Sequence, residues 1–303
     1  PLAVTWSISD GNVGCGSGVT GSIHLNGTRV HSHAIVNGDT EGATHTVYVN
    51  ASPGDFIDLA LSPEGPAGQR DDACDGTFIS MVVNTDIPSN PLQPDGTPFI
   101  PAAPFTLSPN FTWTHTLLNT SWQSSANWNS GSSGIPGIND TILLAPSLLN
   151  RLSLNGTRSV QAARITSEAF LIFNGGDGDA SLTLATGQLI VDGASTSWCE
   201  SPLILGAQGQ WHISNPTGKF RVDNWFEGSN GLSKTGLGTL QLNTPSVYTG
   251  ETVVNAGRLE ATNSSGSATG PGPVRVGFGG TLAGSGSISG NITVEDGGII
   301  APG

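Results

Sequence analysis

Basic residues are scarce in this 303-residue sequence, which has ten Lys and Arg, 23 Asp and Glu, and a formal net charge of −13. Phosphate binding needs a positive patch, so we expect no nucleic-acid partner. No apolar run approaches the roughly 18 residues of a membrane-spanning helix, and no signal peptide is recognisable at Pro1. We therefore expect no membrane span, an acidic surface, and a mature or trimmed chain.

Cysteine is also rare, with Cys15, Cys74 and Cys199 as the only three. None forms a Cys-x-x-Cys pair, so the spacing excludes a zinc ribbon. Cys15 and Cys74 both lie in Gly/Asp-rich segments, and we predict a disulfide between them, with two free buried thiols as the alternative. Cys199 follows Trp198 and is predicted to be a small core residue.

Motifs of known catalytic chemistry are missing. The sequence has no Gly-x-Ser-x-Gly elbow, no His-Glu-x-x-His and no phosphate-binding glycine loop. Cleavage of a polysaccharide needs paired carboxylates, or a basic residue beside calcium, and the C-terminal half is poor in Asp and Glu. Its basic residues show no clustering in the sequence. We predict a protein that is not an enzyme and requires no cofactor. These basic residues include Lys219, Arg221, Lys234, Arg258 and Arg275.

Short alternating apolar runs fill residues 1–87, and turn-forming residues separate them. Period-2 alternation bounded by Gly, Asn and Pro is typical of strands with one buried face. Asn26-Gly27 and Asn37-Gly38 predict type I′ hairpin turns, because both central residues need positive φ. Antiparallel strands without helices indicate a β-sandwich or jelly roll. The runs are residues 3–7, 21–25, 29–36, 44–49, 56–61 and 77–83, and the expected inner faces hold Val47, Val49, Phe56, Ile57, Leu59, Phe78, Ile79, Met81 and Val83.

Proline is concentrated in residues 88–109, which contain seven of them. Each proline ring removes an N–H group and restricts φ, which disfavours both helices and central strands. We predict an extended, semi-rigid linker here, and hence the boundary between two domains.

Residues 110–303 repeat one pattern. Residues 231–257 hold two apolar-alternating runs, 239–242 and 252–254, and similar runs recur before and after them. Short strands that repeat without helices between them are typical of a solenoid or β-helix. The high content of Gly, Ser, Thr and Asn leaves a low-complexity linker as the alternative for the last 70 or so residues. The other runs are 181–184, 188–191, 203–205, 210–213, 220–222, 258–260, 273–276, 281–282, 287–288, 291–294 and 299–300.

The run Leu232-Ser-Lys-Thr-Gly-Leu-Gly-Thr-Leu-Gln-Leu, followed by Val247-Tyr-Thr-Gly-Glu-Thr-Val-Val-Asn-Ala-Gly-Arg-Leu, closely resembles the autotransporter-associated β-strand repeat. The tail from Gly279 is similar. The resemblance covers roughly residues 113–303 and is clearest over 228–303. It implies a right-handed parallel β-helix in a secreted or surface-displayed bacterial protein, and it implies no reaction.

Three tryptophans, Trp113, Trp122 and Trp128, lie in residues 110–160. A β-helix end exposes unpaired backbone groups, so we interpret this segment as a cap over the first coil. An aromatic platform for sugar binding is the alternative. The last coil, which ends at Gly303, is expected to be open or covered by another molecule.

Candidate metal sites come from two clusters. Asp71, Asp72 and Asp75 form the densest acidic group, and their oxygens suit Ca²⁺, with a solvated turn as the alternative. His31 and His33 lie two apart on one predicted strand, so their side chains share a face. Together with a third histidine they could bind a transition metal, unless they form a plain solvated face. Asp55 and Asp58 could add ligands to the acidic cluster, and His24 or His45 could be the third histidine. A separate, weaker candidate is the acidic turn that contains Asp177 and Asp179.

These observations lead to one functional expectation and two alternatives. We expect a non-catalytic extracellular structural protein, a bacterial surface or fibre subunit, that self-associates through β-edges and coil ends into oligomers or filaments. The first alternative is a carbohydrate-binding adhesin whose glycan site lies on the β-sandwich. The second is a polysaccharide lyase or hydrolase acting on the β-helix.

Overall fold

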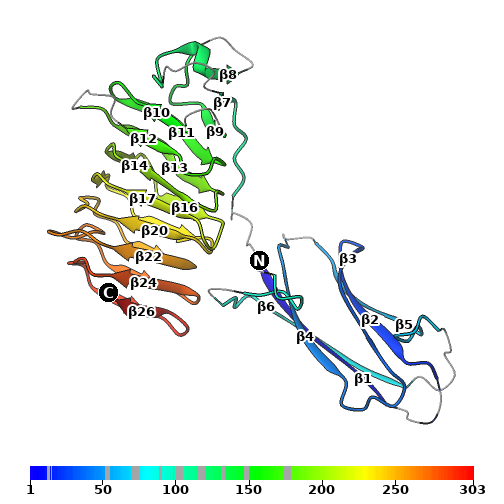
Figure 1. The fold of residues 1–303 in the computed structure, drawn as a ribbon. Helices are drawn as coiled ribbons and strands as arrows, with labels where there is room; N and C mark the ends of the chain where they lie inside the picture. The colour runs from blue at the N-terminus through cyan, green and yellow to red at the C-terminus, as the bar shows by residue number, and fades with distance from the viewer. Residues whose placement is uncertain are drawn as a thin grey trace. The chain divides into compact units, whose positions relative to one another are not determined.

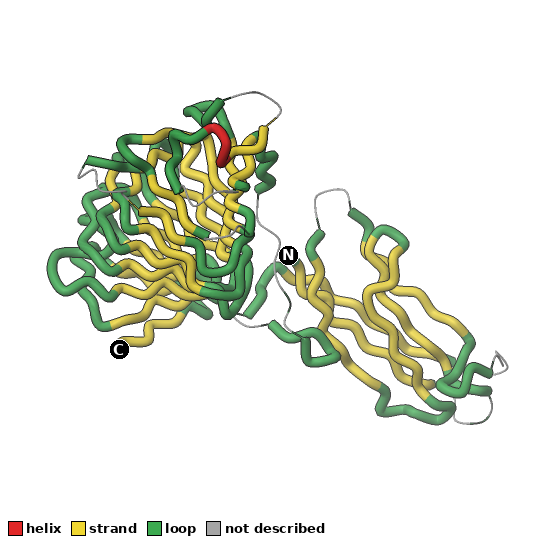
Figure 2. Tube along the Cα trace, turned by 45° about the horizontal axis from the view of Figure 1, so that its top comes forward, coloured by secondary structure: helices red, strands yellow, loops and turns green. Residues whose placement is uncertain are grey.

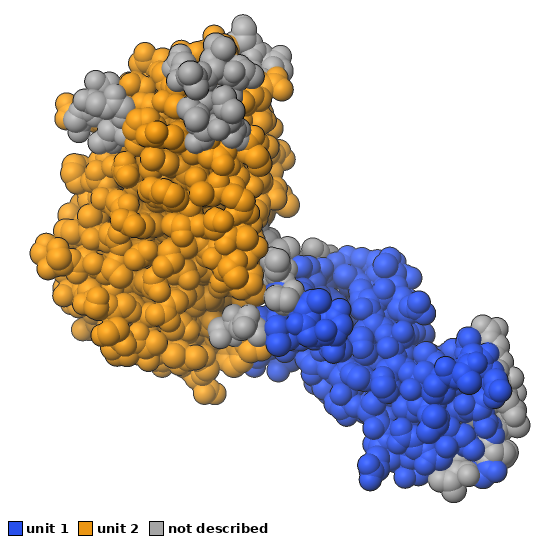
Figure 3. All heavy atoms as spheres, viewed as in Figure 1, with its two compact units in different colours: residues 1–87, 91–101 blue, residues 88–90, 102–303 orange. Residues whose placement is uncertain are grey.

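The computed structural model describes residues 1–11, 14, 16–51, 55–69, 76–88, 91–97, 99, 105–114, 120–130, 134–146, 150–173 and 179–303. The chain forms two compact units, one of residues 1–87 and 91–101 and one of residues 88–90 and 102–303 (Figure 3). The expected all-β fold is confirmed, with antiparallel sheets in the first unit and a parallel β-solenoid of about seven turns in the second (Figure 1). Within the described ranges one 3₁₀ turn, η1 (Ser125–Asn127), is the sole helix (Figure 2).

The first unit pairs two three-stranded antiparallel sheets, and all six expected runs are strands. Their inner faces enclose a core around Trp6 and Ile23, which are fully buried, together with Val47 and Val49 as predicted. Alternation therefore identified the strands, because alternate side chains of a strand face the core side of its sheet. One sheet has the order β4 (Ala43–Val49), β1 (Leu2–Asp10), β6 (Thr77–Asn84), and the other has the order β3 (Thr28–Ile35), β2 (Val19–Leu25), β5 (Ile57–Ser62).

The expected inner face is wrong for Phe56, which precedes β5, and for Phe78, which pairs with Ser9 on the outer face, while Ile79 and Val83 are on the inner face but only partly covered. Phe56 and Phe78 are 72% and 70% exposed, and Ile79 and Val83 are 43% and 44% exposed. Ile79 and Val83 pair with Ile8 and Val4 of β1, so they do lie on the inner face of the sheet. They remain exposed because β6 is an edge strand, and a three-stranded sheet offers no further strand to cover its margin.

The two Asn-Gly turns differ. Asn26 and Gly27 have φ values of 51° and 77°, as a type I′ turn requires, and they join β2 to β3 within one sheet. The prediction for Asn37-Gly38 is wrong, since only Gly38 has positive φ, at 83°. Here the chain passes from β3 to β4 in the other sheet, so no hairpin forms. Asp10 instead accepts a hydrogen bond from the Gly38 N–H at 2.7 Å.

Residues from the proline-rich segment contact the first unit. The Gln93 side chain accepts from Tyr48 N at 3.1 Å and donates to Tyr48 O at 2.8 Å, so its amide pairs with β4 as a strand would. Phe99 is buried and stacks on the Tyr48 ring with centroids 5.7 Å apart. These contacts satisfy backbone groups on the outer edge of β4, beside which the described residues form no further strand.

The second unit winds around two long sheets whose strands are parallel, apart from the β7–β8 pair (Figure 1). One sheet has eight strands: β10 (Arg151–Ser153), β12 (Leu171–Phe173), β14 (Thr196–Cys199), β17 (Lys219–Val222), β20 (Thr239–Leu242), β22 (Gly257–Ala261), β24 (Gly280–Gly284) and β26 (Ile299–Pro302). The other has ten strands in line: β25 (Ile292–Val294), β23 (Val274–Val276), β21 (Thr252–Val254), β19 (Leu232–Thr235), β16 (Gly209–Ile213), β13 (Leu182–Val191), β11 (Arg158–Ile165), β9 (Thr141–Leu144), β7 (Phe111–Trp113) and β8 (Trp128–Ser130). In addition, β15 (Leu203–Leu205) pairs with β13, and β18 (Phe226–Glu227) pairs with β15.

One continuous apolar core runs through the solenoid from Phe111 to Leu282. Its regularity comes from register: Phe220 pairs with Leu240, Leu240 with Leu259, and Leu259 with Leu282 in successive coils. Each residue is buried, so every coil covers the inward side chains of its neighbours. Cys199 lies in this core as predicted, and its burial raises the pKa of its thiol to about 12.

The three tryptophans of residues 110–160 are buried at the β7–β8 end of the solenoid. Trp113 and Trp122 each pack edge-on against Trp128, with centroids 4.9 and 5.0 Å apart. The backbone N–H of Trp122 donates a hydrogen bond to the Ser153 carbonyl at the end of β10. Buried indoles cover the first coil and leave no face free to stack on a sugar, which contradicts the platform alternative.

Two runs differ from expectation at the level of single elements. Residues 181–184 and 188–191 were expected to be separate runs, but they belong to one strand, β13, whose pairing with β11 shifts register between Val160 and Ala162. Residues 287–288 are not a strand. At the last coil, four aliphatic side chains are more than 40% exposed: Ile292, Val294, Ile299 and Ile300.

Candidate functional site

Three histidines gather on the first unit, at the edge formed by β3 and β4. The ring centroid of His45 lies 4.7 Å from that of His31 and 4.5 Å from that of His33. Trp6 is buried beside them, 5.5 Å from His31 and 5.6 Å from His45. The histidines line a half-open pocket of about 410 Å³, whose remaining walls are Val30, Gln93, Pro94 and Asp95.

The pocket favours neutral imidazoles. Burial lowers the pKa of His31 below its ordinary value of 6.5, and the neighbouring His45 and His33 lower it further, while Asp95 opposes them. Burial and then His33 lower the pKa of His45. Neither His31 Nδ1 nor His45 Nε2 has a hydrogen-bond partner among the described residues. Protonation of these rings would place like charges in contact.

The structure thus joins His45, and not His24, to the predicted pair. His24 Nε2 lies 2.9 Å from Ser22 Oγ, with which it hydrogen bonds. Within the described residues no three His, Cys, Asp or Glu side chains are placed to hold a metal ion.

The other predicted site residues are mostly outside the described part of the chain. Asp55 accepts a hydrogen bond from the Asn26 side chain at 2.9 Å, and Asp58 is exposed on β5. The remaining predictions, for calcium and for a disulfide, therefore stay predictions. They concern Asp71, Asp72, Asp75, Asp177, Cys15 and Cys74, which lie outside the described residues.

Basic residues of the solenoid form ion pairs with carboxylates, although the sequence shows no clustering of these basic residues. Glu260 accepts from Lys219 at 2.9 Å and from Arg258 at 2.8 Å. Burial raises the pKa of Glu260, but these two donors outweigh it, so the pKa is lowered. Lys219 and Glu260 are 41 residues apart in the chain and meet because coils stack in register.

Lys234 is the one basic side chain that is fully buried among the described residues. Its Nζ donates to three backbone carbonyls, Thr235 O at 2.9 Å, Gly236 O at 2.8 Å and Ala256 O at 3.1 Å. Burial lowers the pKa of Lys234 to about 7. The three carbonyls match the three N–H groups of an ammonium, so the side chain ties two coils together at a corner.

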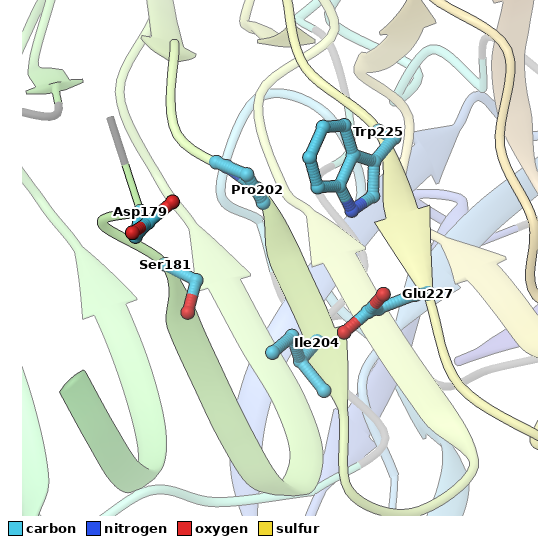
Figure 4. Close-up of a pocket in the computed structure, with 6 residues that line it drawn as sticks. All are labelled: Asp179, Ser181, Pro202, Ile204, Trp225 and Glu227. Carbon is cyan, nitrogen blue, oxygen red and sulfur yellow. The ribbon is translucent and has the colours of Figure 1, made fainter. Parts of the chain in front are cut away.

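A second pocket lies on the outer surface of the solenoid, around Trp225 (Figure 4). Six of the seven tryptophans are buried or half-buried, whereas Trp225 is 47% exposed. Figure 4 shows its indole beside Pro202, with Glu227 on the same rung. The pocket is half-open, measures about 180 Å³, and is lined by Asp179, Ser181, Pro202, Ile204, Trp225 and Glu227.

The register of the parallel strands β13, β15 and β18 brings these side chains together. Leu203 pairs with Leu182 and with Phe226, so the residues immediately before them, Ser181, Pro202 and Trp225, follow one another across three coils. Ile204 and Glu227 are paired in the same ladder. Sequence reasoning missed this site because the lining residues of neighbouring coils are more than 20 residues apart in the chain. The one available signal was Trp225 itself, a large aromatic residue directly before the inward-facing Phe226.

Trp225 is held firmly although its ring is exposed. Its N–H donates to Asn224 Oδ1 at 2.9 Å, and its carbonyl accepts from Leu203 N at 3.2 Å. The following residue, Phe226, is buried between Trp211 and Tyr248, with centroids 4.9 and 5.6 Å away. A rung anchored in the core therefore presents the indole.

The described part of the chain contains no helix that is long and apolar enough to cross a membrane. No protein-family model, curated protein or solved structure matches the chain. The resemblance to the autotransporter-associated repeat accordingly stays a prediction from the residues of the second unit.

Proposed function

We propose that this chain is a non-catalytic structural protein of the bacterial cell exterior, in which the solenoid serves as a stiff stalk and the sandwich as a head. The observation that supports this most is the single apolar cluster that extends through the solenoid from Phe111 to Leu282. A stack of coils with one dry core forms a stable rod without a ligand, because each coil is stabilised by its neighbours. The repeat resemblance supports the extracellular, bacterial setting.

Self-association is the narrower part of this proposal, and strand β6 supports it. Among the described residues β6 pairs only with β1, so its outer edge is open. Phe78 and Val82 are 70% and 63% exposed on one face, and Ile79 and Val83 are partly exposed on the other. The strand has eight residues and contains no charged residue and no proline. Charged residues and prolines are the features that usually protect an edge strand from pairing, so β6 lacks this protection.

The occupant that fits β6 best is a second copy of β6. Residues directly opposite in an antiparallel pair share a face. With Ser80 opposite Ser80 of the partner copy, Phe78 lies opposite Val82 and Ile79 lies opposite Met81, so apolar residues meet apolar residues on both faces. Such a pair joins two three-stranded sheets into one six-stranded sheet. A contact of this kind is self-complementary and gives a closed dimer.

Light scattering after gel filtration tests this contact over a range of protein concentrations. We expect dimers that a charged double variant, Phe78→Lys with Val82→Lys, weakens by at least about tenfold in dissociation constant. Val36→Lys is the matched control, because Val36 is 58% exposed but lies outside the strands. A wild-type chain that stays monomeric at every concentration contradicts the proposal, as does a dimer that the double variant leaves intact.

The non-catalytic part of the proposal needs a separate test. We expect incubation of the protein with neutral and acidic polysaccharides to release no shorter fragments. Release of reducing ends or unsaturated products would favour the lyase or hydrolase alternative instead. Imaging of the native assembly is expected to show the protein within an extracellular fibre or surface layer.

A further inference from the structure

We propose that the pocket around Trp225 is a glycan-binding subsite that holds one sugar ring of a neutral polysaccharide. The pocket is defined by Trp225, Pro202, Ile204, Asp179 and Glu227 on the outer surface of three consecutive coils. This differs from a glycan site on the β-sandwich, and it is independent of self-association through β6.

The indole supplies the apolar half of the recognition. A pyranose ring has a face of C–H groups, and aromatic side chains combine a large apolar surface with an electron-rich face that attracts such groups. Trp225 offers that surface to solvent, and the half-buried Ile204 and the buried Pro202 form the pocket wall beside it on the neighbouring coil. The pocket of about 180 Å³ is smaller than the pockets of roughly 300–1,000 Å³ that enclose whole ligands. It suits one ring of a longer chain that continues along the solenoid.

The carboxylates supply the polar half. Asp179 and Glu227 form no side-chain hydrogen bond and no ion pair with any described residue, and both line the same pocket. Ionised carboxylates are acceptors only, so they match the hydroxyl donors on the rim of a neutral sugar. None of the described residues that line the pocket is basic. Uronate-rich polymers would therefore be repelled.

Rigidity favours binding at this position. The Trp225 backbone is hydrogen bonded on both sides, and Phe226 fixes the rung in the core. An aromatic side chain that is already ordered loses little conformational entropy when a ligand stacks on it. The exposed indole also gives a direct spectroscopic readout, since the other six tryptophans are buried or half-buried.

Titration of the full chain with cellohexaose, xylohexaose, mannohexaose and chitohexaose tests the proposal, read by tryptophan fluorescence and calorimetry. We expect at least one of these oligosaccharides to change the fluorescence and to bind. Trp225→Ala should weaken its affinity by at least about tenfold. Asp179→Asn and Glu227→Gln should each weaken it severalfold while the protein stays folded. Phe278→Ala is the matched control, because Phe278 is a similarly exposed aromatic residue of another coil.

A cationic ligand could also bind to an indole beside two carboxylates. The salt dependence of the affinity distinguishes such a ligand from a neutral sugar. Affinity for a neutral oligosaccharide should change little when NaCl rises from about 0.05 to about 0.5 M, because no ion pair is made. The proposal is overturned if none of the four oligosaccharides binds, or if Trp225→Ala leaves their affinity unchanged. It is also overturned if only a lysine-rich peptide binds, with an affinity that falls steeply with salt.

Discussion

Lys234 shows how a residue that looks like surface in the sequence becomes part of the core. Its neighbours in the chain are Ser233 and Thr235, and the alternation of β19 places Lys234 on the inward side. A buried ammonium is costly unless each of its N–H groups has an acceptor. Carbonyls of Thr235, Gly236 and Ala256 supply three acceptors, from two coils.

Replacing Lys234 by Met is expected to destabilise the solenoid by about 2–4 kcal/mol, because the apolar stem is kept while three buried carbonyls lose their donor. Urea unfolding followed by circular dichroism measures this change. Lys219→Met is the control, since Lys219 forms a partly exposed ion pair with Glu260 and should cost less than about 1 kcal/mol. Equal losses for the two variants would show that the three carbonyl contacts contribute little.

At the scale of elements, the solenoid is a series of short strands that are stable only in a stack. Strands of three to five residues such as β17, β20 and β22 bury a few side chains each. Contacts run from each coil to the next, so a defect should act on its neighbours more than on distant coils.

Leu240→Ala is expected to cost about 2–5 kcal/mol through the lost burial and the cavity that remains. Hydrogen exchange should show the loss of protection in β17, β20 and β22, while β10 and β12 keep theirs. Gln241→Ala, on the outward face of the same strand, should change stability by less than about 0.5 kcal/mol. Uniform loss of protection along the whole solenoid would contradict nearest-neighbour stabilisation.

At the scale of the whole molecule, the two units have separate cores and different kinds of polar site. Histidines with a lowered pKa belong to the sandwich. His31 and His45 have a lower pKa in the folded state than their ordinary value of 6.5. Their contribution to the stability of the folded state is therefore present above pH 6.5 and is lost as the pH falls through the folded pKa.

Calorimetry of the full chain is expected to show two unfolding transitions, because each unit buries its own core. The midpoint of the sandwich transition should fall as the pH decreases below about 6.5, since the unfolded state then binds more protons. His45→Phe keeps a ring beside Trp6 and removes one titrating group, so it should flatten this dependence. A midpoint that stays constant down to about pH 5 would show that His31 and His45 titrate as they do in the unfolded chain.

The elements and the candidate sites were not equally accessible to sequence reasoning. Alternation located β20 and all six strands of the sandwich, because a period of two reports directly which side chains leave water. The same reasoning was wrong for Phe78, which lies on the outer face because its neighbour Ile79 takes the inner one, and it could not say that Ile79 and Val83 would stay partly exposed on an edge strand. It paired His31 with His33, but which further histidine joins them depended on the fold.

The local geometry of this protein can be read from the order of its residues: short strands, turns at glycine and asparagine, and aliphatic residues spaced for a solenoid. Those features depend on neighbours within a few residues, and the chain order contains them. Packing over the whole fold brings Trp225 beside Pro202 and into one pocket with Asp179, brings Glu260 to Lys219, and leaves β6 without a further strand among the described residues. These facts depend on the number of residues in each coil and on the order of strands in each sheet, both of which are set by packing over the whole unit.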